Sequence, residues 1–271
     1  MNPGARSATF RVEGASSRIE ELLGEIFASF AELPSGVEVV VTEEDAGAVR
    51  SLLLEAGLAF SETLEEPRDY VAEAAALQRP VAVGRFLLDP HDDAAGAGAP
   101  EKRRRLHVPA RRAFGTGSHE STRLALRLLL AEPLRGKTVL DVGCGAGPLA
   151  LCAAEEGARV VAFDIDPDAP VATRENALAN GVILTGTYAG PFEALSRKAR
   201  FDVAVANMIQ EEVAPLLPAL RGVLGERGRL VCAGQLLARE EEWRALVSGH
   251  GFALTRLAAE GEWLGSTWEA A

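Results

Sequence analysis

Apolar residues follow a helical spacing and a strand spacing in turn along the second part of the chain, from about residue 119 onward. Such alternation predicts a doubly wound, mostly parallel sheet with helices on both faces. The last two strands lie close together in sequence, which predicts a terminal hairpin and one antiparallel strand. The expected helices are 120–131, 148–156, 168–179, 211–224 and 240–249, and the expected strands are 138–142, 159–164, 183–188, 201–206, 229–233, 252–258 and 262–268.

The first 65 residues carry a smaller pattern of their own. Strands and amphipathic helices alternate there, which predicts a compact α+β domain of ferredoxin-like type over residues 1–65. It has no cluster of polar residues suited to catalysis, so we expect it to recognise the substrate or to support the larger domain. The expected strands are 8–14, 37–41 and 58–64, and the expected helices are 16–31 and 44–56.

A linking helix over 66–79 is expected to join this domain to the larger one, residues 80–271. The larger domain begins with a strand at 81–88, an exposed loop rich in Ala, Gly and Asp at 91–100, and a strand at 105–108 that closes a hairpin. A length of 271 residues is sufficient for one large domain and one small one.

A glycine-rich turn follows the expected strand at 138–142, with the sequence D-V-G-C-G-A-G. Gly143 and Gly145 lack a Cβ, so the backbone can turn tightly there and approach a ligand. Asp164 ends the next strand about 20 residues further on, where a carboxylate can accept hydrogen bonds from ribose hydroxyls. Residues 138–164 therefore predict a nucleoside-binding βαβ unit.

The glycine spacing bears on which nucleoside is bound. The dinucleotide fingerprint is G-x-G-x-x-G, whereas this turn is G-x-G-x-G with Pro148 at the place of the last glycine. The D-x-G-x-G-x-G form resembles the S-adenosylmethionine turn of Rossmann-like methyltransferases. A dinucleotide site and a tight turn that binds nothing are the alternatives.

Charge and composition limit the partners, metal sites and cellular location that we expect for this protein. The formal net charge of −11 argues against a nucleic-acid-binding surface and suits a basic partner. The basic run at 102–105, continued by Arg111 and Arg112, indicates either a solvated loop or a local contact with an acidic or phosphate surface. The spacing of the cysteines and histidines predicts no metal site. With no signal peptide and no run of about 18 apolar residues, we expect a cytoplasmic protein without a membrane span.

One segment has a specific family resemblance. Residues 114–126, F-G-T-G-S-H-E-S-T-R-L-A-L, resemble the F-G-T-G-x-H-x-T-T-R-L-A-L signature of the bacterial ribosomal protein L-eleven methyltransferases. V-A-N-M-I at 205–209 is similar to that family's V-A-N-I-L. The similarity continues through D-I-D-P at 164–167, G-Q-L at 234–236 and Glu262-Trp263, and it spans roughly residues 68–271.

Departures from the family pattern fall near the substrate side and in the linker. Ser118 stands where the family usually has the first of two histidines, and Ser121 replaces a common threonine. Tryptophans that the family often has in the linker region are absent. These changes leave the donor site intact and bear on the identity of the protein substrate.

The resemblance implies a class I S-adenosylmethionine-dependent methyltransferase in which a set of residues contacts the methyl donor. Three of these residues have an alternative structural role. Asp164 could be a solvated carboxylate at the end of a strand, and Asn207 a turn residue at the end of a strand. The Thr122 hydroxyl could accept a hydrogen bond from a backbone amide at the start of a helix. Asn207 is also the candidate catalytic residue, because its carbonyl oxygen can orient the acceptor amine. The donor-contacting residues are Thr122, Gly143, Gly145, Asp164 and Asn207.

Three further residues lie in the family signature. Phe114 and Thr116 are expected in a glycine-hinged flap that covers the donor, and a plain connecting loop is the alternative. His119 either lines the acceptor channel or caps the helix that follows it.

The sequence therefore predicts a monomeric enzyme that uses S-adenosylmethionine to methylate amines of a ribosomal protein. The expected targets are lysine side chains, with an N-terminal amine as a further target, and large-subunit protein eleven is the first candidate substrate. We expect no direct contact with nucleic acid. Two alternatives stay open: a methyltransferase of the same fold that acts on another protein or a small molecule, and a non-catalytic binding module.

Overall fold

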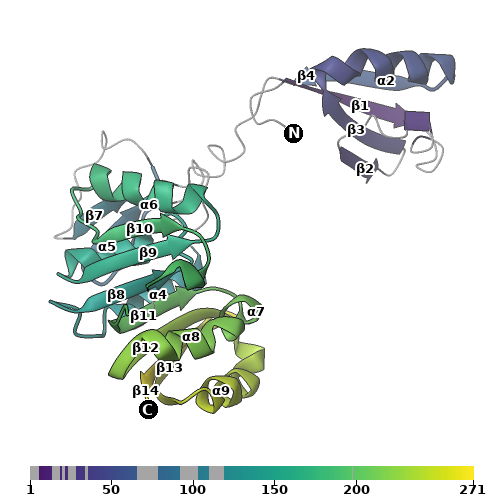
Figure 1. The fold of residues 1–271 in the computed structure, drawn as a ribbon. Helices are drawn as coiled ribbons and strands as arrows, with labels where there is room; N and C mark the ends of the chain where they lie inside the picture. Colours follow the sequence, from purple (N-terminus) through teal and green to yellow (C-terminus); the bar gives the residue numbers. More distant parts are fainter. Residues whose placement is uncertain are drawn as a thin grey trace. The chain divides into compact units, whose positions relative to one another are not determined.

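The structure is a computed structural model that describes residues 6–13, 19, 22–23, 29–33, 36–65, 79–91, 103–109, 119–196 and 198–271. The chain divides into two compact units, Met1–Glu73 and Ala74–Ala271 (Figure 1). Among the described residues, no helix is long and apolar enough to cross a membrane.

The first unit is a four-stranded antiparallel sheet with the helix α2 packed against it. Its strand order is β2-β3-β1-β4, which is the order of a ferredoxin-like fold and confirms the predicted architecture. Thr42 caps α2 by accepting a hydrogen bond from the backbone N–H of Asp45. The elements are β1 (Ser7–Glu13), β2 (Ser29–Leu33), β3 (Gly36–Thr42), α2 (Glu43–Glu55) and β4 (Phe60–Glu65).

The helix expected over 16–31 is wrong at its carboxyl end. Ile19, Leu22 and Leu23 are helical, and Ile19 and Leu23 are buried in the core of this unit. Residues 29–33, however, form the edge strand β2, whose backbone pairs with β3. Pairing with a neighbouring strand overrides the local helical spacing of apolar residues, because the strand's backbone groups find their partners across the sheet.

The second unit is built on a seven-stranded sheet of order β10-β9-β8-β11-β12-β14-β13. All neighbouring pairs are parallel except those made by β14, which runs antiparallel to β12 and to β13. This confirms the doubly wound sheet with a terminal antiparallel hairpin. The strands are β8 (Thr138–Val142), β9 (Arg159–Asp164), β10 (Gly186–Ala189), β11 (Phe201–Asn207), β12 (Leu224–Leu236), β13 (Phe252–Glu260) and β14 (Trp263–Ala270).

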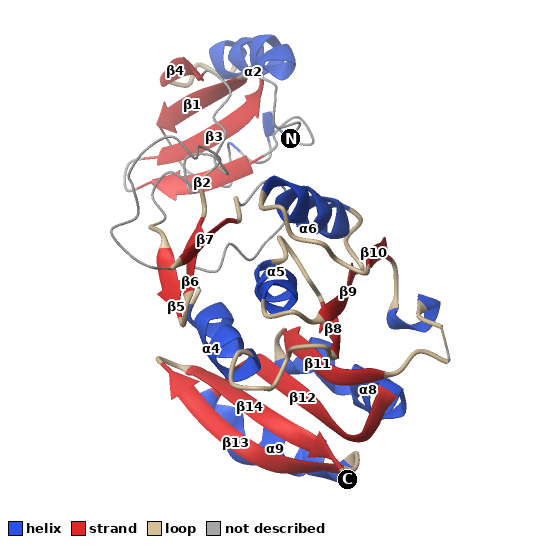
Figure 2. Ribbon diagram, turned by 90° about the vertical axis from the view of Figure 1, so that its left-hand side faces the viewer, coloured by secondary structure: helices blue, strands red, loops and turns tan. Residues whose placement is uncertain are grey.

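Helices cover both faces of this sheet (Figure 2). Val139 packs into a core shared with α4 and α5, whereas Leu140 packs into a second core shared with α8 and α9. Successive residues of a strand point to opposite faces, so both must be apolar when both faces are covered. The helices are α4 (Glu120–Leu129), α5 (Pro148–Glu155), α6 (Asp168–Ala179), α7 (Gln210–Val213), α8 (Leu217–Val223) and α9 (Glu240–Gly249).

Three further expectations for this unit are corrected. The segment at 81–88 is a tight hairpin, β5 (Val81–Val83) with β6 (Phe86–Asp89), which turns at Gly84 with φ +55°. β7 (Arg104–His107) then pairs in parallel with β6 and does not close a hairpin. The helix expected over 211–224 is split into α7, a 3₁₀ turn and α8, and Pro215 and Pro218 fall at the two breaks, where proline removes a helical hydrogen bond.

The expected linking helix and the expected loop at 91–100 fall almost entirely on residues 66–78 and 92–102, which lie outside the described residues. They stay predictions.

The hydroxyl of Ser266 in β14 joins two buried tryptophans. Its Oγ accepts hydrogen bonds from Trp243 Nε1 at 3.1 Å and from Trp268 Nε1 at 2.8 Å. All three side chains are fully buried, so these indole N–H groups cannot find water instead.

We therefore expect Ser266→Ala to destabilise the second unit, because two buried donors lose their acceptor. The expected loss is about 1–3 kcal/mol in the free energy of unfolding measured with urea. Ser248→Ala, an exposed change in α9, is the matched control. An unchanged unfolding midpoint for Ser266→Ala would show that the two indoles repartner without cost.

Candidate functional site

The predicted donor residues gather at one edge of the seven-stranded sheet. Gly143 follows β8, Asp164 ends β9 and Asn207 ends β11, and these three strands are neighbours in the sheet. Because the strands are parallel, their carboxyl ends meet at the same edge, where ligands bind in open α/β sheets (Figure 2).

The turn between β8 and α5 requires glycine at two positions for steric reasons. Gly143 and Gly147 have φ values of +71° and +88°, which side chains rarely adopt. A Cβ on Gly147 would lie 2.8 Å from the side chain of Thr173, and one on Gly143 would lie 3.0 Å from Met208 Sδ. The turn is therefore packed tightly from two sides.

Helix α6 supports this turn through two buried side chains. Thr173 Oγ1 donates to the carbonyl oxygen of Gly145 at 2.9 Å, and Asn176 Nδ2 donates to that of Ala146 at 2.9 Å. Both side chains are fully buried. The sequence prediction assigned them no role, although two polar residues three positions apart on the buried face of a helix are a detectable signal.

Asp164 is oriented by the same turn. Its Oδ2 accepts a hydrogen bond from the backbone N–H of Gly145 at 3.1 Å, and its Oδ1 accepts from that of Asp166 at 3.1 Å. The side chain is half-buried, so the remaining lone pairs can accept from ligand hydroxyls. The structure thus brings together Gly145 and Asp164, two of the predicted donor residues.

Thr122 and Asn207 form the second pair at this edge. Asn207 Nδ2 donates to Thr122 Oγ1 at 3.0 Å, although the residues are 85 positions apart in sequence. Thr122 is buried, and its hydroxyl contacts Asn207 across the interface between α4 and β11. Asn207 Oδ1 is buried and has no hydrogen-bond partner among the described residues, which leaves one acceptor at the end of β11.

His119 is the N-cap of α4. Its Nδ1 accepts from the backbone N–H of Ser121 at 3.3 Å and lies 2.8 Å from Ser121 Oγ. The ring also packs edge-on against Trp263, with 5.0 Å between ring centroids. Nδ1 therefore serves the helix cap. Phe114, Thr116 and Ser118 lie outside the described residues.

Asp141 is a buried carboxyl beneath the glycine turn that the sequence prediction left without a role. Its Oδ2 accepts from the backbone N–H of Ala150 at 3.0 Å, and its Oδ1 has no partner among the described residues. Desolvation raises the pKa of this carboxyl to about 7, and the charge of Asp164 acts in the same direction. The sequence signal was an acidic residue inside an otherwise apolar strand.

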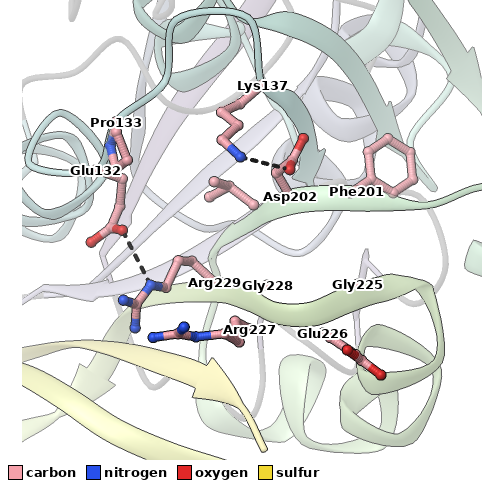
Figure 3. A pocket seen from close by; sticks show the side chains of 11 residues that line it. Glu132, Pro133, Lys137, Phe201, Asp202, Gly225, Glu226, Arg227, Gly228 and Arg229 are labelled. Atoms are coloured by element: carbon pink, nitrogen blue, oxygen red, sulfur yellow. Dashed lines mark hydrogen bonds and ion pairs between the residues drawn. The ribbon is translucent and has the colours of Figure 1, made fainter.

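One cleft that is lined by charged side chains lies at the opposite ends of the strands from this edge. The cleft, of about 250 Å³, lies at the amino ends of β11 and β12 (Figure 3). There Lys137 pairs with Asp202 at 3.0 Å, and Arg229 with Glu132 at 3.5 Å. No group of three or more metal-ligating side chains occurs in the part of the chain that the structure describes.

The raised pKa of Asp141 predicts a pH-dependent stability. The folded-state pKa of about 7 lies above the ordinary aspartate pKa of 3.8, so the folded protein binds this proton more tightly than the unfolded chain. The free energy of unfolding must then fall as the pH rises between these two values and level off above them. Asp141→Asn keeps an acceptor for Ala150 but removes the titration.

Between pH 5 and pH 7 we expect the wild type to lose about 2 kcal/mol of stability relative to Asp141→Asn, measured with urea and without ligand. Parallel curves for the two proteins would mean that Asp141 titrates normally in the folded state.

Comparison with known proteins assigns the family. Residues 35–269 match the family model described as ribosomal protein L11 methyltransferase (PrmA). A protein of that name from Thiobacillus denitrificans is 36% identical over 257 residues, which cover 91% of this chain and 84% of the relative. Another from Thermus thermophilus is 41% identical over 152 residues, which cover 56% of this chain and 59% of the relative.

A solved structure agrees with the sequence match. The ribosomal protein L11 methylase of Lactobacillus delbrueckii subsp. bulgaricus superimposes with a TM-score of 0.61 at 27% identity, and the superposition covers 68% of this chain and 94% of that one. The family model spans most of the chain, and its match includes both pairs of residues at the carboxyl edge of the sheet. This chain therefore belongs to the ribosomal protein L11 methyltransferase family and is a methyltransferase.

Proposed function

We propose that this protein transfers methyl groups from S-adenosylmethionine to amines of a ribosomal protein, with large-subunit protein eleven as the substrate. The targets are lysine side chains and, in addition, an N-terminal amine, and the enzyme acts as a cytoplasmic monomer. The observation that carries the proposal is the meeting of the Gly145–Asp164 pair with the Thr122–Asn207 pair at one sheet edge, in a chain of this family.

The residues at this edge fit the methyl donor. Gly143 and Gly145 lack a Cβ and have positive φ values, so the backbone of the turn can come close to a ligand. Asp164 presents a half-buried carboxylate that can accept from ribose hydroxyls. Asp141 Oδ1, which has no hydrogen-bond partner among the described residues, is a further polar atom in the same region. When bound, S-adenosylmethionine supplies the electrophilic methyl group and the leaving group.

The protein's own task is to align the acceptor amine. A lysine amine has a reference pKa of about 10.4 and must lose its proton before it can attack. Desolvation at the site favours the neutral amine. Because Asn207 Nδ2 is held by Thr122, its Oδ1 can accept an N–H of the amine and leave the nitrogen lone pair facing the methyl group. Such alignment does not require a dedicated general base.

Under this proposal the other predicted residues and the two domains also have roles. Phe114 and Thr116 belong to a flap over the donor, and His119 lines the acceptor channel through the ring atoms that do not cap α4. Residues 1–65 recognise the protein substrate, residues 66–79 form the linking helix, and residues 80–271 hold the donor and carry out the transfer.

Ser118 and the altered linker favour one competing function, a methyltransferase of this fold that acts on a different protein or a small molecule. Incubating the enzyme with labelled donor and whole-cell extract, then identifying the labelled species by mass spectrometry, separates the two. Label on large-subunit protein eleven supports the proposal. Label confined to another species contradicts it, and an absence of any transfer would favour a binding module.

The donor assignment predicts the effect of Asp164→Ala. Loss of charge-assisted hydrogen bonds to the ribose should weaken binding of S-adenosylmethionine by about 1.5–3 kcal/mol, measured by calorimetry. NAD serves as the control ligand and should not bind the wild type. Unchanged donor affinity in a folded variant would remove Asp164 from the site, and tight binding of NAD alone would overturn the donor assignment.

The division of labour predicts the effect of deleting residues 1–65. We expect donor affinity to stay nearly intact and methylation of the protein substrate to be lost, because an amine must be brought within about 3–3.5 Å of the methyl group. A cooperative melt is the control for folding. Full activity of the truncated protein would show that recognition lies elsewhere, whereas loss of donor binding would show that the first unit completes the donor pocket.

A further inference from the structure

Met208 connects the acceptor side of the site to the donor turn. It follows Asn207 directly, and its backbone N–H donates to the carbonyl oxygen of Ala233 in β12 at 3.0 Å. Its side chain packs where a Cβ on Gly143 would lie, with Sδ 3.0 Å from that position. The peptide after Asn207 therefore lies between β12 and the glycine turn.

Two consecutive residues of β12 hold the carbonyl group of Met208, which belongs to the Met208–Ile209 peptide. Gly234 has a φ of +94°, and a Cβ there would lie 2.7 Å from the carbonyl oxygen of Met208, so only glycine permits the approach. Gln235 Nε2 donates to the same carbonyl oxygen at 2.9 Å. The register of β12 with β14 shifts between Ala233 and Gln235, which is the irregularity that turns Gln235 toward Met208.

The orientation of the Gln235 amide is fixed by its neighbours. Its Nε2 also contacts the carbonyl oxygen of Ala233 at 3.2 Å, and both contacts are acceptors, so the amide must present its NH₂ group. Oε1 is then buried without a hydrogen-bond partner among the described residues. An unpaired buried oxygen carries a desolvation penalty that an apolar side chain of similar size would avoid. What glutamine supplies, and an apolar residue cannot, is the N–H donor to Met208.

We propose that Gln235 is a positioning residue for methyl transfer, which fixes the carbonyl group of Met208, next to Asn207, and so sets the direction in which the acceptor amine is held. This inference rests on the proposed amine methylation. A carbonyl oxygen has two lone pairs, so Met208 can accept from Gln235 and still accept an N–H of the substrate amine. The Met208 carbonyl and Asn207 Oδ1 then orient the amine together, while Gln235 acts through Met208 without touching the substrate.

The test compares two substitutions at Gln235 in the full-length enzyme. Gln235→Met keeps the approximate volume but removes the N–H donors. Gln235→Glu keeps the shape but places an acceptor against two carbonyl oxygens. Gln210→Met is the matched control, because Gln210 is also buried, donates one bond, to Glu242 Oε1 at 2.6 Å, and has an unpartnered Oε1. Its contact is with α9 and not with Met208.

We expect the single-turnover rate of methyl transfer to fall about ten-fold in Gln235→Met and further in Gln235→Glu, with donor affinity unchanged within two-fold. Gln210→Met should melt at a similarly lowered temperature yet keep the transfer rate. Equal rates for wild type and Gln235→Met, or equal losses in Gln235→Met and Gln210→Met, would overturn the inference. If the wild type itself transfers no methyl group to a protein amine, the proposed function fails and the inference fails with it.

Discussion

The tight packing of the glycine turn between β8 and α5 is the constraint on which the site depends. Besides its glycines the turn contains only Cys144 and Ala146, whose side chains offer no oxygen or nitrogen atom, so neighbouring elements must supply the hydrogen-bond partners of its buried peptide groups. Thr173 and Asn176 of α6 satisfy two of its carbonyl oxygens, and Asp164 of β9 accepts from the N–H of Gly145. The same contacts place the Asp164 carboxylate, so the stability of the turn and the position of a donor-site residue have one cause.

Helix α4 positions Asn207 on the side of the site where the acceptor amine is proposed to bind. Thr122 in its first turn contacts Asn207, while Arg123 pairs with Glu260 of β13 through Nε at 2.7 Å. That ion pair is partly exposed and adds only about 0–1 kcal/mol. Ser121, a departure from the family pattern, still offers a hydroxyl to His119 in the cap of α4. The substitution therefore keeps the polar contact at the start of the helix that carries Thr122.

The predicted elements were most accurate where local pattern and tertiary contact agree. The alternating helices and strands after residue 119 predicted the sheet, because strands covered on both faces are apolar along most of their length and their connections are short. The errors have physical reasons. The helical spacing extended to residue 31, but residues 29–33 find their hydrogen-bond partners in β3. β7 pairs in parallel with β6, which no local pattern encodes.

The sequence by itself determined the glycine turn, Asp164 and the family signature, since these depend on backbone freedom and on spacing along the chain. Only the tertiary structure decided which side chains support them. Thr173, Asn176, Asp141 and Gln235 are ordinary polar residues until folding buries them next to particular backbone groups. Their roles come from contacts between segments distant in sequence, 28 residues apart for Thr173 and Gly145 and 27 for Gln235 and Met208. Spacing along the chain cannot specify such contacts, because burial and partner are set only when the strands and helices pack.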